Sequence, residues 1–229
     1  MRIQDVQYHL LAAATMTMLT VGNALGQSST GDATAPLDIL RTARQKAQSS
    51  QLNATNIATG GNNAVRHLVV QGFNTNIDHT VNFAVMPADP AKDRLMVEVH
   101  YYDPYDFTLN DKSTIWQWGA ATTDPAATAA WGGEAYTYAQ FQKMKGKFVD
   151  RGVPVLLGEF AAIRRSEYAG AETYRLAWDR YTARSARAYG LVPVYLDAGA
   201  ARDNHSSGLF DRATGAQVYP EFIQALVGN

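Results

Sequence analysis

The sequence predicts an α/β fold built from about four parallel strand–helix units. From residue 66 onward, short apolar runs alternate with longer stretches of helical periodicity. The runs VPVLL (153–157) and LVPVY (191–195) lack strict apolar–polar alternation, which is typical of strands covered on both faces. In parallel α/β folds the functional residues gather at the carboxyl ends of the strands. The residues that follow each run are therefore the candidates for a site.

Each unit of this pattern pairs one strand with one helix. The strands are expected within RHLVVQG (66–72), RLMVEVHYY (94–102), VPVLLG (153–158) and LVPVYLD (191–197). The helices are expected within IDHTVNFAV (77–85), with Asp78 as N-cap, and within EAYTYAQFQKMKGKFVDRG (134–152), AETYRLAWDRYTARSARAYG (171–190) and YPEFIQALV (219–227). The long segment between residues 103 and 133 shows no regular period.

The composition and the N-terminal residues indicate the class of protein and its location relative to the cell. The 229 residues carry a net charge of −1 and contain no cysteine, so we expect no nucleic-acid partner, no disulfide and no thiolate metal site. The apolar run LLAAATMTMLTV (10–21) is too short to span a bilayer and suits a signal peptide over residues 1–26, although an amphipathic helix is the alternative. We therefore expect a secreted or periplasmic protein, with no membrane contact in its mature form. A polar linker (27–36) and one domain (37–229) would follow.

Common catalytic motifs are absent from the sequence. It has no Gly-rich phosphate loop after a strand, no HExxH and no G-x-S-x-G. Carboxylates, aromatic residues and histidine remain, and Glu159, His100 and Asp197 each stand at the end of an expected strand. An acid near aromatic side chains suits glycoside hydrolysis, because sugar rings stack on aromatic faces and the transition state needs a carboxylate. Structural roles are the alternatives: Glu159 beside a helix N-terminus, His100 as a packed histidine and the tryptophans as core.

Four segments carry a family resemblance. VPVLLGEF, MVEVHYYDPYDF and VPVYLDAG followed by HSSGLFDR resemble the last three strands of family 5 glycoside hydrolases, and GGNNAVRHLVVQGFNTNID resembles the fifth. The resemblance implies half of a TIM-type (β/α)8 barrel, equivalent to strands 5–8. It implies a retaining β-glycoside hydrolase, of endoglucanase or β-glucosidase type, that acts on β-1,4-glucans or cello-oligosaccharides. This chemistry needs no cofactor.

The resemblance also assigns roles to individual residues. Glu159 would be the nucleophile, and His100 and Tyr102 would contact both Glu159 and the substrate. Further substrate contacts are expected from Trp116, Trp118, Asn74 and Asp197.

The sequence departs from the family pattern at several positions. The Asn-Glu-Pro motif that carries the general acid/base is absent, and Leu196 stands where a tryptophan is usual. Glu98 is an alternative acid/base, because it faces the same side of its strand as His100, although a structural role fits it better. An inactive carbohydrate-binding remnant is the alternative function. A half-barrel exposes two sheet edges, so we also expect a homodimer or a higher self-association, and coverage of one edge by the N-terminal segment is the alternative.

Overall fold

The computed structural model describes residues 66–87 and 93–228, all within one compact unit. Its centre is a parallel sheet of four strands in the order β1-β2-β3-β4. The strands are β1 (Leu68–Gln71), β2 (Leu95–His100), β3 (Val155–Phe160) and β4 (Leu191–Tyr195). The predicted α/β fold with four parallel strands is confirmed. The expected signal peptide and linker lie outside the described residues.

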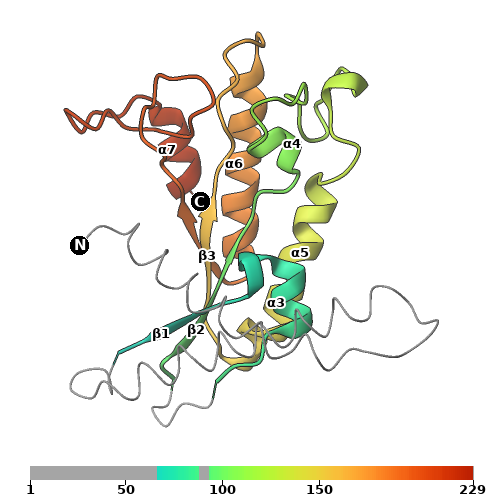
Figure 1. The fold of residues 1–229 in the computed structure, drawn as a ribbon, viewed down its shortest axis with the longest axis vertical. Helices are drawn as coiled ribbons and strands as arrows, with labels where there is room; N and C mark the ends of the chain where they lie inside the picture. Colours follow the sequence, from blue (N-terminus) through green and yellow to red (C-terminus); the bar gives the residue numbers. More distant parts are fainter. Residues whose placement is uncertain (1–65, 88–92, 229) are drawn as a thin grey trace, which may run out of the picture. The chain divides into compact units, whose positions relative to one another are not determined.

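Helices follow the strands (Figure 1), and the four longer ones fall within the ranges that the periodicity predicted, whereas α4 lies in the segment without a regular period. They are α3 (Ile77–Phe83), α4 (Tyr105–Thr108), α5 (Glu134–Lys147), α6 (Ala171–Ala188) and α7 (Pro220–Val227), with 3-10 turns η4 (Phe73–Thr75), η5 (Pro125–Ala127) and η6 (Val149–Arg151). Gly152 ends the α5–η6 segment at φ 77°, a left-handed conformation that glycine adopts without steric cost. Across the described ranges, we find no helix with the length and apolar character that crossing a membrane requires.

The start of α3 differs from the prediction. The N-cap is Asn76, whose side chain accepts a hydrogen bond from the His79 backbone N–H at 3.0 Å. Asp78 instead lies in the first turn, where its carboxylate forms an ion pair with Lys143 of α5 at 2.6 Å. Asn and Asp are equally good N-caps, so neighbouring candidates cannot be ranked by residue type alone.

The main hydrophobic core lies between the sheet and the helices. Alternate strand residues such as Val97, Val99 and Leu157 are at most 1% exposed and belong to one cluster with residues of α5 and α6. Tyr101, directly after β2, stacks on Trp178 of α6 with ring centroids 5.9 Å apart, and its hydroxyl bonds to Thr137 of α5 at 2.8 Å. The end of β2 is therefore held firmly against two helices.

The opposite side of the sheet is much more open. Val192 and Val194 of β4 are 52% and 46% exposed, and Leu196 beyond the strand is 36% exposed. The expectation that both faces of this strand are covered is therefore wrong for β4. Neighbouring residues of a strand point to opposite faces, and Leu191 belongs to the hydrophobic core cluster whereas Val192 and Val194 do not. A stripe of apolar side chains consequently remains accessible.

Candidate active site

The carboxyl ends of β2 and β3 lie side by side. His100 pairs with Glu159 in the sheet register, and the pairing shifts by one residue between Val99 and His100. The Tyr101 N–H donates to the Glu159 carbonyl at 2.9 Å, which continues the pairing beyond the strand. Such irregularities redirect side chains at the end of a strand. Here the shift places the side chains of the two strand ends next to one another.

Glu159 is the centre of this group. The Tyr102 hydroxyl donates to its Oε2 atom at 3.0 Å, and His100 Nδ1 lies 3.2 Å from the same oxygen. The Glu159 side chain is nevertheless 39% exposed. The carboxylate is thus fixed in orientation by two neighbouring side chains and stays accessible from outside.

His100 connects Glu159 to a second carboxylate. Its other ring nitrogen, Nε2, lies 3.0 Å from Glu98 Oε1. A neutral imidazole has only one N–H, so it cannot donate to both carboxylates. Both contacts are hydrogen bonds only when His100 carries two protons or one of the two glutamates carries one. Glu98, His100 and Glu159 therefore form one row of side-chain contacts across the ends of β2 and β3.

A glycine in β3 makes room for Glu98. A Cβ atom added to Gly158 would lie 2.6 Å from Glu98 Cδ, closer than side chains pack. Gly158 directly precedes Glu159, so the close approach occurs at the base of the site. A glycine inside a strand often marks such an approach. The sequence carried this signal, but its partner could not be identified before the strands were placed.

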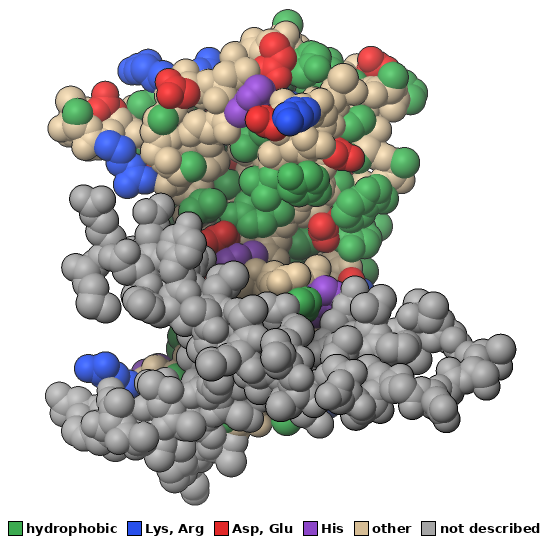
Figure 2. All heavy atoms as spheres, in the orientation of Figure 1, with side chains coloured by type: hydrophobic (Ala, Val, Ile, Leu, Met, Phe, Trp, Pro, Cys, Tyr) green, Lys and Arg blue, Asp and Glu red, His purple; other side chains and the backbone are tan. Residues whose placement is uncertain are grey.

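A pocket of about 230 Å³ adjoins this group. Its lining includes Asn74, His100, Tyr102 and Asp103. Asn74 has a left-handed backbone (φ 53°), which asparagine tolerates better than most residues. The structure therefore brings Asn74, His100, Tyr102 and Glu159 into one region. Figure 2 shows hydrophobic side chains on the viewed face beside acidic and histidine side chains.

Two residues of the pocket have shifted pKa values. Burial, with the adjacent Glu159 carboxylate, raises the pKa of Tyr102 well above its usual range, so this hydroxyl stays protonated and donates. Burial also raises the pKa of Asp103, although a hydrogen bond from Tyr136 partly opposes the shift. Tyr102 is thus a permanent hydrogen-bond donor to Glu159 near neutral pH.

Asp197 is bound differently from Glu159. Its carboxylate accepts the backbone N–H groups of Gly199 at 2.7 Å and Leu209 at 3.1 Å, and it pairs with Arg212 at 3.0 Å. Burial alone would raise its pKa, but these hydrogen bonds and the arginine outweigh it and lower the pKa. These contacts give Asp197 a role in holding the loop after β4, and the expected substrate contact stays a prediction.

The two tryptophans expected in the cleft differ in their surroundings. Trp118 is only 4% exposed, packs against Tyr181 and donates its indole N–H to the Gly132 carbonyl at 2.8 Å. Little of its surface is exposed, and the expectation that it contacts the substrate stays a prediction. Trp116 is partly buried and stacks on Tyr168 at 5.4 Å. One of its faces is therefore already occupied.

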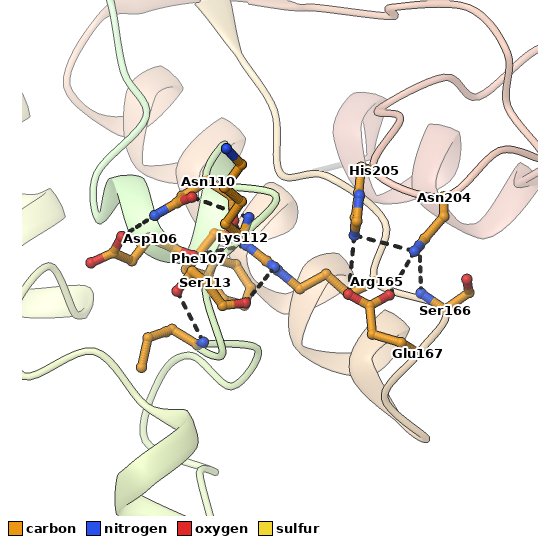
Figure 3. Close-up of polar contacts among 11 residues, drawn as sticks. Asp106, Phe107, Asn110, Lys112, Ser113, Arg165, Ser166, Glu167, Asn204 and His205 are labelled. Atoms are coloured by element: carbon orange, nitrogen blue, oxygen red, sulfur yellow. Dashed lines mark hydrogen bonds and ion pairs between the residues drawn. The ribbon is translucent and has the colours of Figure 1, made fainter.

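The loops around the site are tied together by polar contacts (Figure 3). Arg165, 2% exposed, donates to the carbonyls of Asp106, Asn110 and Ser113, and so joins the loop after β3 to the loop after β2. Glu167 lies 3.0 Å from His205 of the loop after β4. Burial alone would raise the pKa of Glu167, but hydrogen bonds, chiefly the one to His205, lower it to about 2.

The sequence analysis missed an aromatic pair beside the pocket. Trp131 is 49% exposed and meets Tyr136 of α5 edge to face at 5.3 Å. Their spacing in the sequence gave no reason to single them out from other aromatic residues. As for metals, within residues 66–87 and 93–228 no three His, Asp or Glu side chains gather in an arrangement that could hold an ion.

Comparison with known protein families shows which family the chain belongs to. The family model for cellulase (glycosyl hydrolase family 5) matches residues 46–202. The chain belongs to glycosyl hydrolase family 5. The matched range includes the ends of β2 and β3 with Glu98, His100 and Glu159.

Individual relatives support this assignment. Endoglucanase A of Paenibacillus barcinonensis is 40% identical over 180 residues, which cover 74% of this chain and 45% of the relative. The xyloglucan-specific endo-beta-1,4-glucanase BoGH5A of Bacteroides ovatus is 38% identical, over 69% of this chain and 32% of the relative. A family 5 xyloglucanase structure from Paenibacillus pabuli superposes with a TM-score of 0.75 at 34% identity, covering 88% of this chain and 57% of that one. The chain thus spans about half the length of these relatives, or less.

Proposed function

We propose that the protein is a retaining β-glycoside hydrolase that cleaves β-1,4-glucans or cello-oligosaccharides. The observation that carries this proposal is the environment of Glu159. Its carboxylate remains accessible and is oriented at one oxygen by Tyr102 and His100, both of which line a pocket. A fixed, accessible carboxylate is what attack on an anomeric carbon requires.

The chemistry assigns one role to each group. A carboxylate oxygen of Glu159 attacks the anomeric carbon and forms a glycosyl ester, while the bond to the leaving oxygen breaks and that oxygen takes a proton from a general acid. Water then hydrolyses the ester, and the acid group recovers its proton. Tyr102 and His100 hold Glu159 in the orientation for attack. Glu98 holds His100 through Nε2.

The general acid is the part of the mechanism that these residues leave open. Retaining enzymes place their two carboxyl groups about 5–5.5 Å apart. Glu98 is the alternative acid, but its Oε1 atom already contacts His100 and its side chain packs against Gly158. These contacts favour a positioning role for Glu98.

The substrate class rests on the relatives. Their names describe endoglucanases and a xyloglucan-specific endo-β-1,4-glucanase, and one solved structure contains a xyloglucan-type heptasaccharide. A β-1,4-linked glucan backbone is common to these ligands. We propose the same backbone as the substrate here.

The direct test is hydrolysis of aryl β-glucoside and aryl β-cellobioside by the wild-type chain and by Glu159→Gln. The proposal expects turnover by the wild-type chain and none above background by the variant, because the amide cannot form the ester. Equal turnover in both proteins would contradict the role of Glu159. Verified folding of both proteins by circular dichroism is the necessary control.

A glucan-binding protein without turnover is the second candidate. It is favoured by the missing Asn-Glu-Pro motif and by Leu196, which offers no aromatic platform. Binding of cellohexaose by a folded wild-type chain that hydrolyses neither aryl substrate would establish this second function.

We propose in addition that the four βα units form half of a (β/α)8 barrel, which a second copy completes. The exposed stripe Val192, Val194 and Leu196 faces away from the helices, and β1 and β4 are the outer strands of the sheet. Two such halves related by a two-fold axis would bury both apolar faces and pair the outer strands.

Light scattering during size exclusion tests this association. The wild-type chain should elute as a dimer, and Val194→Lys should elute as a monomer because it places a charge in the buried interface. Val227→Lys is the matched control, since Val227 is 75% exposed on α7 and lies off this face. A monomeric wild-type chain would contradict the proposal.

A further inference from the structure

Thr108, the last residue of α4, is fully buried and contacts a residue that orients Glu159. The Thr108 hydroxyl donates to the Tyr102 carbonyl at 2.5 Å and lies 3.3 Å from the Pro104 carbonyl. Tyr102 is the residue whose own hydroxyl donates to Glu159 Oε2. A hydroxyl that is 0% exposed therefore holds the backbone of the residue that orients the carboxylate.

The peptide groups next to Tyr102 are also held by other elements. The Tyr101 N–H donates to a carbonyl of β3 at 2.9 Å, and the Asp103 carbonyl accepts the Trp178 indole N–H at 3.0 Å. The Thr108 hydroxyl fixes the carbonyl between them. Because a side chain leaves the backbone at Cα, three held peptide groups restrict the directions in which the Tyr102 ring can point.

The helix α4 is too short to hold its own last turn. A helix of four residues leaves its last carbonyls without donors from within the helix. Arg165 supplies donors, since its Nη2 group lies 2.8 Å from the Asp106 carbonyl and 3.3 Å from the Phe107 carbonyl (Figure 3). Arg165 is 2% exposed, and hydrogen bonds are electrostatically stronger in such a low-dielectric environment than in water. The guanidinium therefore anchors α4.

These contacts form a closed ring that begins and ends at Glu159. The chain that continues from Glu159 reaches Ile163, whose N–H donates to the Thr108 carbonyl at 2.9 Å, and then Arg165. From Thr108 the ring returns through Tyr102 to Glu159. Each step is either a hydrogen bond or the covalent chain, so a change at Thr108 reaches the carboxylate through Tyr102.

Thr182 of α6 shows that a buried threonine need not make such a bond. It is also 0% exposed, but its hydroxyl has no hydrogen-bond partner among the residues that the structure describes. The two threonines therefore allow the same substitution with and without the loss of a hydrogen bond.

We propose that Thr108 is a positioning residue, whose hydroxyl sets the orientation of Tyr102 and thereby of the Glu159 carboxylate that attacks the substrate. The inference rests on the proposed function, since it assumes that Glu159 forms the glycosyl ester. It adds that a buried residue without contact to the substrate controls kcat.

The first test is steady-state kinetics on aryl β-cellobioside. Thr108→Val nearly keeps the shape of the side chain but removes the hydroxyl, so kcat should fall about ten-fold while KM stays within about two-fold of wild type. Thr108→Ser keeps the hydroxyl and should retain kcat within about two-fold. Thr182→Val is the matched control and should also stay within about two-fold, since no hydrogen bond is lost. An equal loss in Thr108→Val and Thr108→Ser would overturn the inference, because it would show that packing and not the hydroxyl matters.

A double-mutant cycle with Tyr102→Phe separates positioning from a general loss of structure. If Thr108 acts through the Tyr102 hydroxyl, adding Thr108→Val to Tyr102→Phe should lower kcat no further than about two-fold. Two residues that act independently would instead give losses that multiply in kcat. Such independent losses, in a wild-type chain that is active, would reject the inference and leave the proposed function intact.

Carbon NMR of the protein labelled at tyrosine Cζ gives a readout that does not need turnover. The Tyr102 signal, assigned by its loss in Tyr102→Phe, should move in Glu159→Gln and in Thr108→Val, and should stay in place in Thr108→Ser and Thr182→Val. An unmoved signal in Thr108→Val would overturn the inference. A wild-type chain without hydrolysis would reject the proposed function, and the NMR signal would still decide whether Thr108 sets the position of Tyr102.

Discussion

Glu159, the second-last residue of β3, and Asp197, two residues after β4, are acids near strand ends of the same sheet, and their surroundings differ. Glu159 is contacted by the side chains of His100 and Tyr102 at one oxygen. Asp197 accepts backbone N–H groups of its own loop and pairs with Arg212. Each acid comes directly after an apolar run in the sequence, but different groups donate hydrogen bonds to the two carboxylates.

The comparison shows what distinguishes a reactive carboxylate from a structural one. Backbone N–H groups bind both Asp197 oxygens and fold the loop around them, so the acid is used to hold the chain. Side-chain donors orient Glu159 without enclosing it. The kind of donor, and not the place after a strand, is therefore the more informative observation.

The largest expected difference lies in turnover. We predict that Glu159→Gln lowers kcat on aryl β-cellobioside by about 10³-fold or more, as loss of a covalent nucleophile does in other enzymes. Asp197→Asn should retain activity within about three-fold of wild type, because it changes a loop contact and not the reacting group. Steady-state kinetics on both variants checks this, and a larger loss in Asp197→Asn than in Glu159→Gln would reverse the comparison.

A second prediction concerns the glycine beneath Glu159. Gly158→Ala should destabilise the protein by about 1–3 kcal/mol and reduce activity, because the added methyl group displaces Glu98 and with it His100. Gly146→Ala in α5 is the control. Nothing lies within 4 Å of a Cβ atom at Gly146, so alanine should stabilise the helix by about 1 kcal/mol. Urea denaturation of both variants measures the difference, and equal effects would show that Glu98 is not held against Gly158.

A third carboxylate, Asp179 of α6, extends the comparison to a fully buried acid. It accepts the Ala162 N–H at 3.2 Å, and the Tyr195 hydroxyl lies 3.4 Å from its other oxygen. Burial raises its pKa to about 7, although Arg175 opposes the shift. Between about pH 4 and pH 7, Asp179 is therefore largely protonated in the folded protein, whereas it would be charged in the unfolded chain.

The sign of the pH effect follows from this shift. A raised carboxyl pKa contributes stability that is complete below the unfolded pKa, near 4, and is lost as the pH rises to about 7. Asp179→Asn removes this titration. The free energy of unfolding of the variant, relative to wild type, should rise by about 3 kcal/mol between pH 4 and pH 7. Parallel stability curves over this range would contradict the prediction.

The smallest expected effect is on the loop held by Asp197. Asp197→Asn should lower the free energy of unfolding by about 1 kcal/mol at pH 7, because it weakens charge-assisted hydrogen bonds. Since the Asp197 pKa is lowered in the fold, this stabilisation is present above the unfolded pKa and disappears as the pH falls below it. The two proteins should therefore converge in thermal midpoint near pH 2, and a constant difference would argue against a role for the charge.

The sequence was sufficient for the elements and for part of the site. Apolar runs and helical periodicity located β1–β4 and the main helices, and the strand ends brought His100, Tyr102 and Glu159 together. The contact between Glu98 and Gly158 could not be predicted, because it depends on the register between two strands. The burial of Trp118 and the exposure of Trp131 depend on how the loop after β2 packs, and nothing in the local sequence distinguishes the two.

The central claim is that Glu159 forms a covalent bond with the substrate, and covalent trapping tests it most directly. A 2-deoxy-2-fluoro-β-cellobioside with a dinitrophenolate leaving group slows both the formation and the hydrolysis of the glycosyl ester. The ester, once formed, is therefore long-lived. Peptide mass mapping should then find the added sugar mass on the peptide that contains Glu159, and no label in Glu159→Gln. A label on any other carboxylate, or none in a chain that hydrolyses aryl β-cellobioside, would contradict the account.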